Sequence, residues 1–143
     1  MTAASKAHSD MGAPSATAPK NWILWTGRVL SAIPVLMLLF SAAMKLSHAQ
    51  PVVESWVGMF GWAEGMLVPI GLLEVACAVV YVIPRTAVLG AILVSCYLAA
   101  AFATHLRIAD TGGGIAPVVL GLFAWGGLYL REERLRALLP LRS

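Results

Sequence analysis

The sequence predicts an all-α integral membrane protein, a four-helix bundle with a short amphipathic interfacial helix between its first and second spans. Of its 143 residues, 59% are hydrophobic and only 12% are charged, and the mean hydropathy is +0.82. A soluble domain of this size carries far more charge on its surface. Four apolar segments reach or approach the length of a membrane span, and none alternates polar with apolar residues as a β-barrel strand does.

Length and hydropathy predict one membrane domain, residues 22–139, between two tails. The N-terminal tail, 1–21, is rich in Ala, Ser, Pro and Lys and is expected to be disordered. The C-terminal tail is 140–143. At about 1.5 Å per residue, the first three spans reach or approach the ~30 Å hydrocarbon thickness. The fourth is short and is expected to use Trp125 and Tyr129 as interfacial anchors. The spans are predicted at about 22–44, 66–83, 86–104 and 115–130.

The segment between the first two spans is predicted to form the amphipathic helix, because its apolar residues recur at spacings near three and four. An alternative treats the first span as a signal peptide with small residues at Ser47-His48-Ala49. Its apolar run is longer than a usual signal core, and Lys45 interrupts the approach to that site. The apolar positions of the predicted helix are Val52, Val53, Trp56, Val57 and Phe60.

Charge asymmetry predicts the orientation of the spans. With an even number of spans, eight cationic residues share one side, whereas the opposite side has only Lys45 and Arg107 beside three acids. The positive-inside rule therefore places both termini in the cytoplasm. The net charge of +3 reflects this asymmetry and does not indicate nucleic-acid binding. The eight residues are Lys6, Lys20, Arg28, Arg85, Arg131, Arg134, Arg136 and Arg142.

Small residues predict how the spans pack and connect. The third span carries one at every fourth position, which forms a ridge that a neighbouring helix can approach closely. The run Gly112-Gly113-Gly114 predicts a flexible loop between the third and fourth spans. The ridge comprises Ala87, Ala91, Ser95, Ala99 and Ala103.

Glu74 lies in the middle of the second span and is the most informative residue of the chain. An ionisable group at that depth costs roughly a few kcal/mol unless it has a partner or water. Lys45 ends the first span and His105 ends the third, so antiparallel connection places both at the end of the bundle where the second span begins. The pattern fits either a structural ion pair or a site that handles protons, a ligand or a quinone. The candidate intramembrane polar site comprises Glu74, Lys45, His105 and Arg107.

The remaining motifs argue against several kinds of chemistry. No His, Cys and carboxylate residues occur at metal-ligand spacing, so no metal site is expected. Cys77 and Cys96 are predicted at depths that differ by roughly 6 Å, which disfavours a direct disulfide. The chain has no CxxC, Walker loop, GxGxxG, GxSxG or HExxH motif. No independent catalytic motif is therefore present.

Five short motifs follow one another along the chain: Ser41-Ala42-Ala43-Met44-Lys45-Leu46, Gly71-Leu72-Leu73-Glu74, Ile83-Pro84-Arg85-Thr86, Ala103-Thr104-His105-Leu106-Arg107, and Leu128-Tyr129-Leu130-Arg131 continuing through Arg134-Leu135-Arg136. Over roughly residues 25 to 140, this arrangement resembles the DoxX-like family of small bacterial four-span membrane proteins. The resemblance implies a bacterial cytoplasmic (inner) membrane location, and Lys45, Glu74 and His105 match the family's polar positions. The family takes its name from a membrane subunit associated with thiosulfate:quinone oxidoreduction, and other relatives are linked to redox homeostasis complexes.

These observations leave three functions open. The favoured one is an accessory or anchor subunit of a quinone-linked membrane redox system, whose electrons would come from a partner oxidoreductase subunit. The second is a small proton-coupled carrier, which would act as a homo-oligomer because four spans are few for a carrier. The third is a structural or assembly factor in the lipid bilayer. If the chain takes part in an oxidoreductase at all, it is expected to be a non-catalytic or accessory subunit.

Overall fold

The computed structural model describes residues 21–138, so the two predicted tails lie almost entirely outside the described residues. The described chain contains four helical segments that are long and apolar enough to cross a membrane. The regular secondary structure of residues 21–138 consists of helices alone, without strands, which confirms the prediction of an all-α membrane four-helix bundle. The long helices are α1 (Asn21–Leu46), α3 (Leu67–Val82), α4 (Ala87–Arg107) and α5 (Thr111–Arg131).

Shorter helical elements connect and flank the long ones. The predicted helix between the first two spans is α2 (Gln50–Glu54), which continues into a π-helical turn, η1 (Ser55–Met59). The 3-10 turn η2 (Glu64–Met66) leads into α3, and η3 (Pro84–Thr86) joins α3 to α4. The chain then ends its described part in α6 (Glu133–Leu138), an element that was not predicted separately.

The fourth long helix extends beyond its predicted span. The run Gly112-Gly113-Gly114, predicted as a flexible loop, is instead part of the first turns of α5. Asp110 caps this helix, because its Oδ1 accepts a hydrogen bond of 2.9 Å from the Gly113 backbone N–H. Such a cap offsets part of the low helix propensity of glycine.

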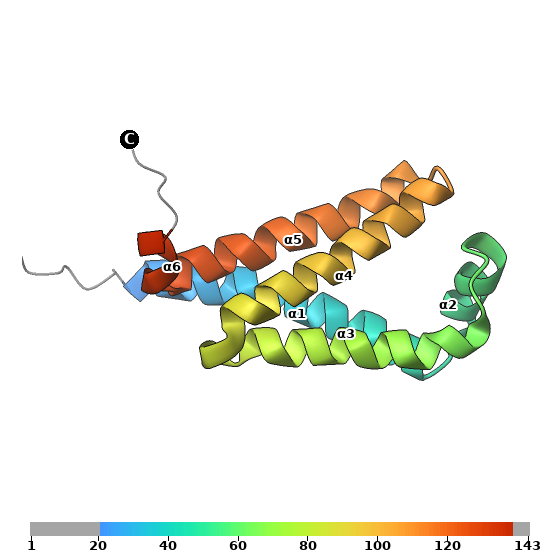
Figure 1. The fold of residues 1–143 in the computed structure, drawn as a ribbon, viewed down its shortest axis with the longest axis horizontal. Helices are drawn as coiled ribbons and strands as arrows, with labels where there is room; N and C mark the ends of the chain where they lie inside the picture. Colours follow the sequence, from blue (N-terminus) through green and yellow to red (C-terminus); the bar gives the residue numbers. More distant parts are fainter. Residues whose placement is uncertain (1–20, 139–143) are drawn as a thin grey trace, which may run out of the picture.

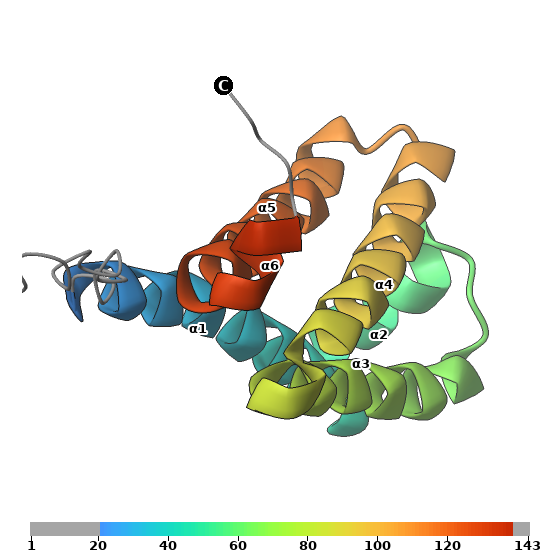
Figure 2. The same ribbon diagram turned by 60° about the vertical axis from the view of Figure 1, so that its left-hand side comes forward.

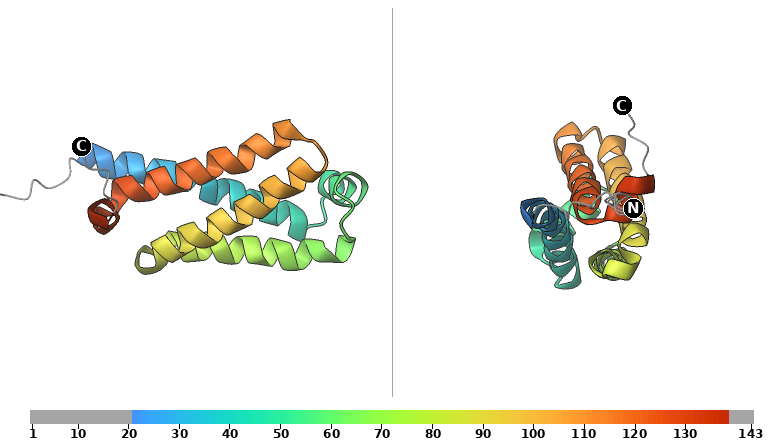
Figure 3. Two further views of the ribbon diagram at one scale, coloured as in Figure 1. Left: turned by 45° about the horizontal axis from the view of Figure 1, so that its top comes forward. Right: turned by 90° about the vertical axis from the view of Figure 1, so that its left-hand side faces the viewer.

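The long helices form a bundle that is closed at one end and opens toward the other. Helix α1 contacts α3 and α5, and α4 contacts the same two helices. Figures 1 and 2 show α4 and α5 diverging from α1 and α3 toward the end at which α2 lies. The end-on view in Figure 3 shows the four helices around a common axis. We call the diverging end the open end, and the end where α1 begins and α5 ends the basic end.

Glycines bring the helices close together at the basic end. A Cβ added at Gly90 of α4 would overlap the backbone of Tyr81 of α3. A Cβ added at Gly127 of α5 would lie 2.6 Å from the Ser31 backbone nitrogen and 2.9 Å from the Gly27 carbonyl oxygen of α1. Small residues allow membrane helices to approach this closely. The absence of a side chain at Gly90 and Gly127 therefore allows the helices to pack closely at this end.

Tyr81 adds polar contacts between three helices at the same end. Its side chain is almost fully buried, at 1% exposure. Its hydroxyl donates to the Ala124 carbonyl oxygen at 2.7 Å and lies 3.0 Å from the Ser31 hydroxyl oxygen. Hydrogen bonds between membrane helices contribute about 0.6 kcal/mol each on average. Tyr81 therefore connects α3 to both α5 and α1.

The ridge of small residues on α4 is buried against neighbouring helices along only part of its length. Ala87 and Ala91 are buried, as the prediction of a helix contact requires. Ala99 and Ala103, farther toward the open end, are exposed. The divergence of the helices accounts for this difference, because the neighbouring helix surfaces move apart along α4 (Figure 1).

Candidate functional site

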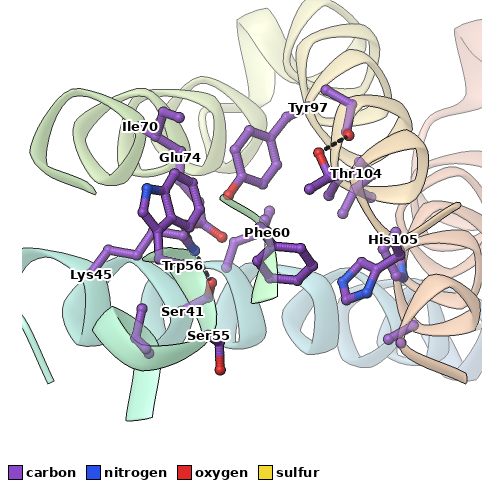
Figure 4. Close-up of a pocket in the computed structure, with 18 of the residues that line it drawn as sticks. Ser41, Lys45, Ser55, Trp56, Phe60, Ile70, Glu74, Tyr97, Thr104 and His105 are labelled. Atoms are coloured by element: carbon purple, nitrogen blue, oxygen red, sulfur yellow. Dashed lines mark hydrogen bonds and ion pairs between the residues drawn. The ribbon is translucent and has the colours of Figure 1, made fainter. Parts of the chain in front are cut away.

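A cavity of about 680 Å³ lies between the helices at the open end. Small-molecule sites in proteins typically have volumes of about 300–1,000 Å³. Residues of α1, α3, α4 and α5 line the cavity, and the α2–η1 segment (Gln50–Met59) lies at its end (Figure 4). Its lining is mostly apolar and includes Leu38, Trp56, Phe60, Ile70, Leu98 and Leu120.

A buried ion pair forms the main polar feature of the cavity wall. Lys45 Nζ donates to Glu74 Oε2 at 2.9 Å, and the two residues are only 9% and 1% exposed. Lys45 also donates to the Ser41 hydroxyl, one turn earlier in α1. Removing one partner of a buried pair leaves an uncompensated charge, which typically costs about 3–5 kcal/mol. The pair therefore links the end of α1 to the middle of α3.

Tyr97 of α4 contributes a third polar group to the same part of the cavity. Its hydroxyl points toward the Glu74 carboxylate of the neighbouring helix α3 (Figure 4). A cationic donor, a hydroxyl and a carboxylate acceptor therefore converge from three helices, α1, α4 and α3. A few convergent polar groups in an otherwise apolar cavity are typical of a site that orients a ligand.

His105 lines the cavity near the end of α4 and is oriented by a carboxylate. Its Nδ1 lies 2.9 Å from Oδ2 of Asp110. A Cβ at Gly113 would overlap both side chains, so the contact between His105 and Asp110 in this geometry depends on the glycine. The Gly113 backbone N–H, followed by the His105 side chain, lowers the pKa of the Asp110 carboxyl below its ordinary value of 3.8. Asp110 is thus favoured in its ionised form, in which it fixes the orientation of the imidazole.

Arg107, at the end of α4, contacts the residues that follow η1. Its guanidinium donates to the Phe60 carbonyl oxygen and lies 5.9 Å from the centroid of the Trp62 ring. The Phe60 ring meets the His105 ring edge to face, with centroids 5.1 Å apart. Gly61 follows with a φ of +67°, a conformation that glycine adopts without strain. These contacts hold the α2–η1 segment over the cavity.

The structure places the four residues that the sequence singled out in three different settings. Glu74 and Lys45 form the buried pair directly. His105 lines the same cavity, but the carboxylate within hydrogen-bonding distance of its ring is that of Asp110 rather than Glu74. Arg107 points toward the segment after η1 and is not among the residues that line the cavity.

Three polar side chains of this region were not singled out from the sequence: Ser41, Tyr97 and Asp110. Ser41 lies one helical turn before Lys45, so its spacing was a usable signal. Asp110 precedes the glycine run at a position where a carboxylate commonly caps a helix, which was also a usable signal. Tyr97 gave none, because an aromatic residue inside an apolar helix usually packs in the core.

Comparison with known proteins identifies the family of the chain. The model of the DoxX-like family matches residues 29–127, a range that contains the buried ion pair, His105 and Asp110. No curated protein and no solved structure matches the chain. Because the family match extends over more than half of its length, this multi-pass membrane protein belongs to the DoxX-like family.

Proposed function

We propose that the chain binds a quinone in the cavity at the open end and serves as a non-catalytic subunit of a membrane redox system. The observation that carries this proposal is a ligand-sized apolar cavity with a buried ion pair in its wall. In the proposal the protein resides in a bacterial inner membrane with both termini in the cytoplasm. A partner oxidoreductase exchanges electrons with the quinone.

The residues present fit a lipophilic ring that carries oxygen atoms. The apolar lining suits the ring and the beginning of an isoprenoid chain, and the Lys45 ammonium and the Tyr97 hydroxyl can donate to a ring oxygen. When bound, a quinone supplies redox chemistry in which two electrons and two protons convert it to a quinol. Glu74 can accept a proton from a hydroxyl held in the cavity. His105, oriented by Asp110, can pass protons at the cavity's outer end.

The proposal is tested by measuring the quinone that the purified protein retains in mild detergent. Mass spectrometry of lipid extracts gives the molar ratio of quinone to protein for wild type and for Tyr97→Phe, which removes only one hydroxyl. The same ratio is measured for Glu74→Gln. Removing one hydrogen-bond donor to a ring oxygen costs about 0.5–1.5 kcal/mol, so the ratio for Tyr97→Phe should fall by about two- to tenfold. Glu74→Gln removes the carboxylate that orients the Lys45 donor and should also lower the ratio.

Glu64→Gln is the matched control, because Glu64 is an exposed carboxylate in η2 outside the cavity lining. It should retain as much quinone as wild type. Circular dichroism confirms that each variant is folded before the ratios are compared. The proposal fails if wild type holds no more quinone than an unrelated four-span protein, or if all variants hold equal amounts. Loss of stability in Glu74→Gln with no ligand in any sample would favour a structural role instead.

A further inference from the structure

Arg107 belongs to the polar site predicted from the sequence, yet its side chain contacts the chain between α1 and α3 instead of lining the cavity. Its guanidinium donates to the Phe60 carbonyl oxygen and lies 5.9 Å from the Trp62 ring centroid. Both partners belong to residues 50–62, a segment that supplies part of the cavity lining. Arg107 therefore connects the end of α4 to a segment that closes part of the cavity. The lining residues of this segment are Pro51, Val52, Ser55, Trp56, Phe60 and Trp62.

The other contacts of residues 50–62 attach the segment only weakly to the long helices. No residue of α2 or η1 is buried. The Ser55 hydroxyl donates to a carbonyl oxygen within α2, and the Trp56 indole donates to the Ala63 carbonyl oxygen directly after the segment. On the α4 side, the Phe60 ring meets the His105 ring edge to face. An element with so few buried contacts can open locally at a low cost in free energy.

The backbone has two positions at which this segment can rotate. His48, just before it, has a φ of +50°, a conformation that residues other than glycine seldom adopt. Gly61, near its end, has a φ of +67°, and a Cβ added there would meet no atom within 4 Å. The π-helical turn η1 lies between these positions, and such turns occur frequently at functional sites. His48 and Gly61 are therefore suitable hinges for the residues between them.

The cavity behind this segment contains the buried ion pair. Lys45 and Glu74 line the cavity but are only 9% and 1% exposed. Figure 4 shows Trp56 and Phe60 among the side chains around the same cavity. Lipid surrounds the long helices, and the helices pack closely at the basic end, so a charged solute has to approach the pair from the open end. Residues 50–62 lie at that end.

We propose that residues 50–62 form a lid over the cavity and that Arg107 holds this lid closed. In the closed state, Trp56 and Phe60 separate the ion pair from water at the open end. When the contact between Arg107 and Phe60 breaks, the lid rotates at its hinges and water-soluble molecules reach the cavity. The lid goes beyond the proposed quinone site, because it controls access to the cavity whichever ligand binds there.

Reaction of a cysteine inside the cavity with a water-soluble reagent tests the lid. Ala101→Cys, on the cavity wall, is introduced together with Cys77→Ala and Cys96→Ala, and this parent protein is placed in phospholipid nanodiscs. The reagent is the sulfonatoethyl methanethiosulfonate anion, and mass spectrometry measures the rate of labelling. Arg107→Gln should raise this rate at least about fivefold, because it removes a hydrogen bond that keeps the lid closed. Loss of a positive charge would by itself slow an anionic reagent, so electrostatic attraction cannot produce this increase.

Gly61→Ala is a second variant that changes no side-chain contact of the lid. Alanine is strained at a φ of +67°, whereas its Cβ would touch nothing, so the variant acts through the backbone alone. It should also raise the labelling rate at least about fivefold. Arg85→Gln is the matched control, because it removes the same charge from an exposed arginine of η3. Its rate should stay within about twofold of the parent rate.

Two further cysteines separate opening of the lid from loosening of the bundle. His48→Cys is exposed and gives the rate for an open site, whereas Val94→Cys replaces a core residue that is 1% exposed. Val94→Cys should stay unlabelled when Arg107→Gln is added, and labelling there would overturn the lid. Equal rates at Ala101→Cys in the parent, Arg107→Gln and Arg85→Gln would also overturn it, as would parent labelling as fast as at His48→Cys. If Arg107→Gln does not fold, Gly61→Ala decides the question. No quinone enters this experiment, so its result is independent of the quinone proposal.

Discussion

At the scale of single residues, Lys45 and Glu74 depend on each other for a partner inside the membrane. Their 2.9 Å contact joins α1 to α3 beside the cavity. Either residue alone would be an unpaired buried charge. Even as a pair, they lose their hydration on burial, and this loss costs free energy that two apolar residues would not lose. Such a pair is more easily explained by a ligand that uses it than by stability.

We expect Glu74→Gln to lower the free energy of unfolding by about 3–5 kcal/mol, because it leaves Lys45 buried without a carboxylate. The double variant Lys45→Met with Glu74→Leu should be as stable as wild type or more so, since it replaces both charges with apolar groups. Titration with denaturing detergent, followed by circular dichroism, measures both. A double variant that is less stable than Glu74→Gln alone would contradict this account of the pair.

Asp110 predicts a pH dependence at the beginning of α5. Its pKa is lowered in the folded protein by the Gly113 N–H and by His105, so its contribution to stability is fully present above the ordinary carboxyl pKa of 3.8. That contribution is lost as the pH falls from there through the lowered pKa. Wild type should therefore exceed Asp110→Asn in stability at pH 6, and the difference should shrink below pH 3.8.

Thermal unfolding from pH 6 downward measures this difference. Glu54→Gln serves as the control, because Glu54 is an exposed carboxylate of α2 without a salt bridge among the described residues. A difference between wild type and Asp110→Asn that stays constant through the acid range would show that the cap does not act through its charge.

The sequence predicted the charged members of the site better than the uncharged ones. Glu74 and Lys45 stand out because a charge inside or beside a span is costly and requires an explanation. The Tyr97 hydroxyl does not stand out, because only the relative rotation of α4 and α3 brings it near the carboxylate. His105 was grouped with Glu74, yet Asp110 is its partner, because the turn after α4, in which the Asp110 N–H donates to the His105 carbonyl oxygen, brings this carboxylate beside the imidazole.

At the scale of elements, the long helices were predictable because their hydropathy far exceeds that of any loop. The start of α5 was not, because a run of three glycines usually indicates flexibility. The cap from Asp110 and the tight packing of Gly113 against His105 stabilise a helix there. Close contacts between helices were likewise hard to assign, since Gly90 and Gly127 look no different in sequence from glycines that touch nothing.

We expect Gly90→Ala to destabilise the contact between α3 and α4, because its Cβ would overlap the Tyr81 backbone. Overpacking typically costs about 1–3 kcal/mol, and backbone has less freedom to move than a side chain. Gly121→Ala is the control, since its Cβ would have only an ordinary contact, 3.8 Å from a Leu98 methyl group. Detergent unfolding compares the two, and equal stability of both variants would argue against a close contact at Gly90.

At the scale of the whole molecule, the antiparallel helices and the charge distribution predict one orientation. The open end carries exposed His48, and the basic end carries exposed Arg134. In a background with Cys77→Ala and Cys96→Ala, His48→Cys in intact cells should react with a membrane-impermeant maleimide added outside. Arg134→Cys should react only after the membrane is permeabilised. The reverse labelling pattern would contradict the positive-inside assignment.

Because the close glycine contacts lie at the basic end, we expect the helices to move apart more easily at the open end of the bundle. Lateral pressure acting on the leaflet around the open end would change the separation of α1 and α5 there, while the opposite leaflet would meet a nearly rigid bundle. The distance between spin labels at Leu46 and Thr111 should therefore vary with lipid chain length. The distance between labels at Trp25 and Val88 should not. Equal changes in both distances would contradict this. If only the first distance varies, the thickness of the surrounding membrane would change the width of the cavity and hence the fraction of cavities that hold a ligand.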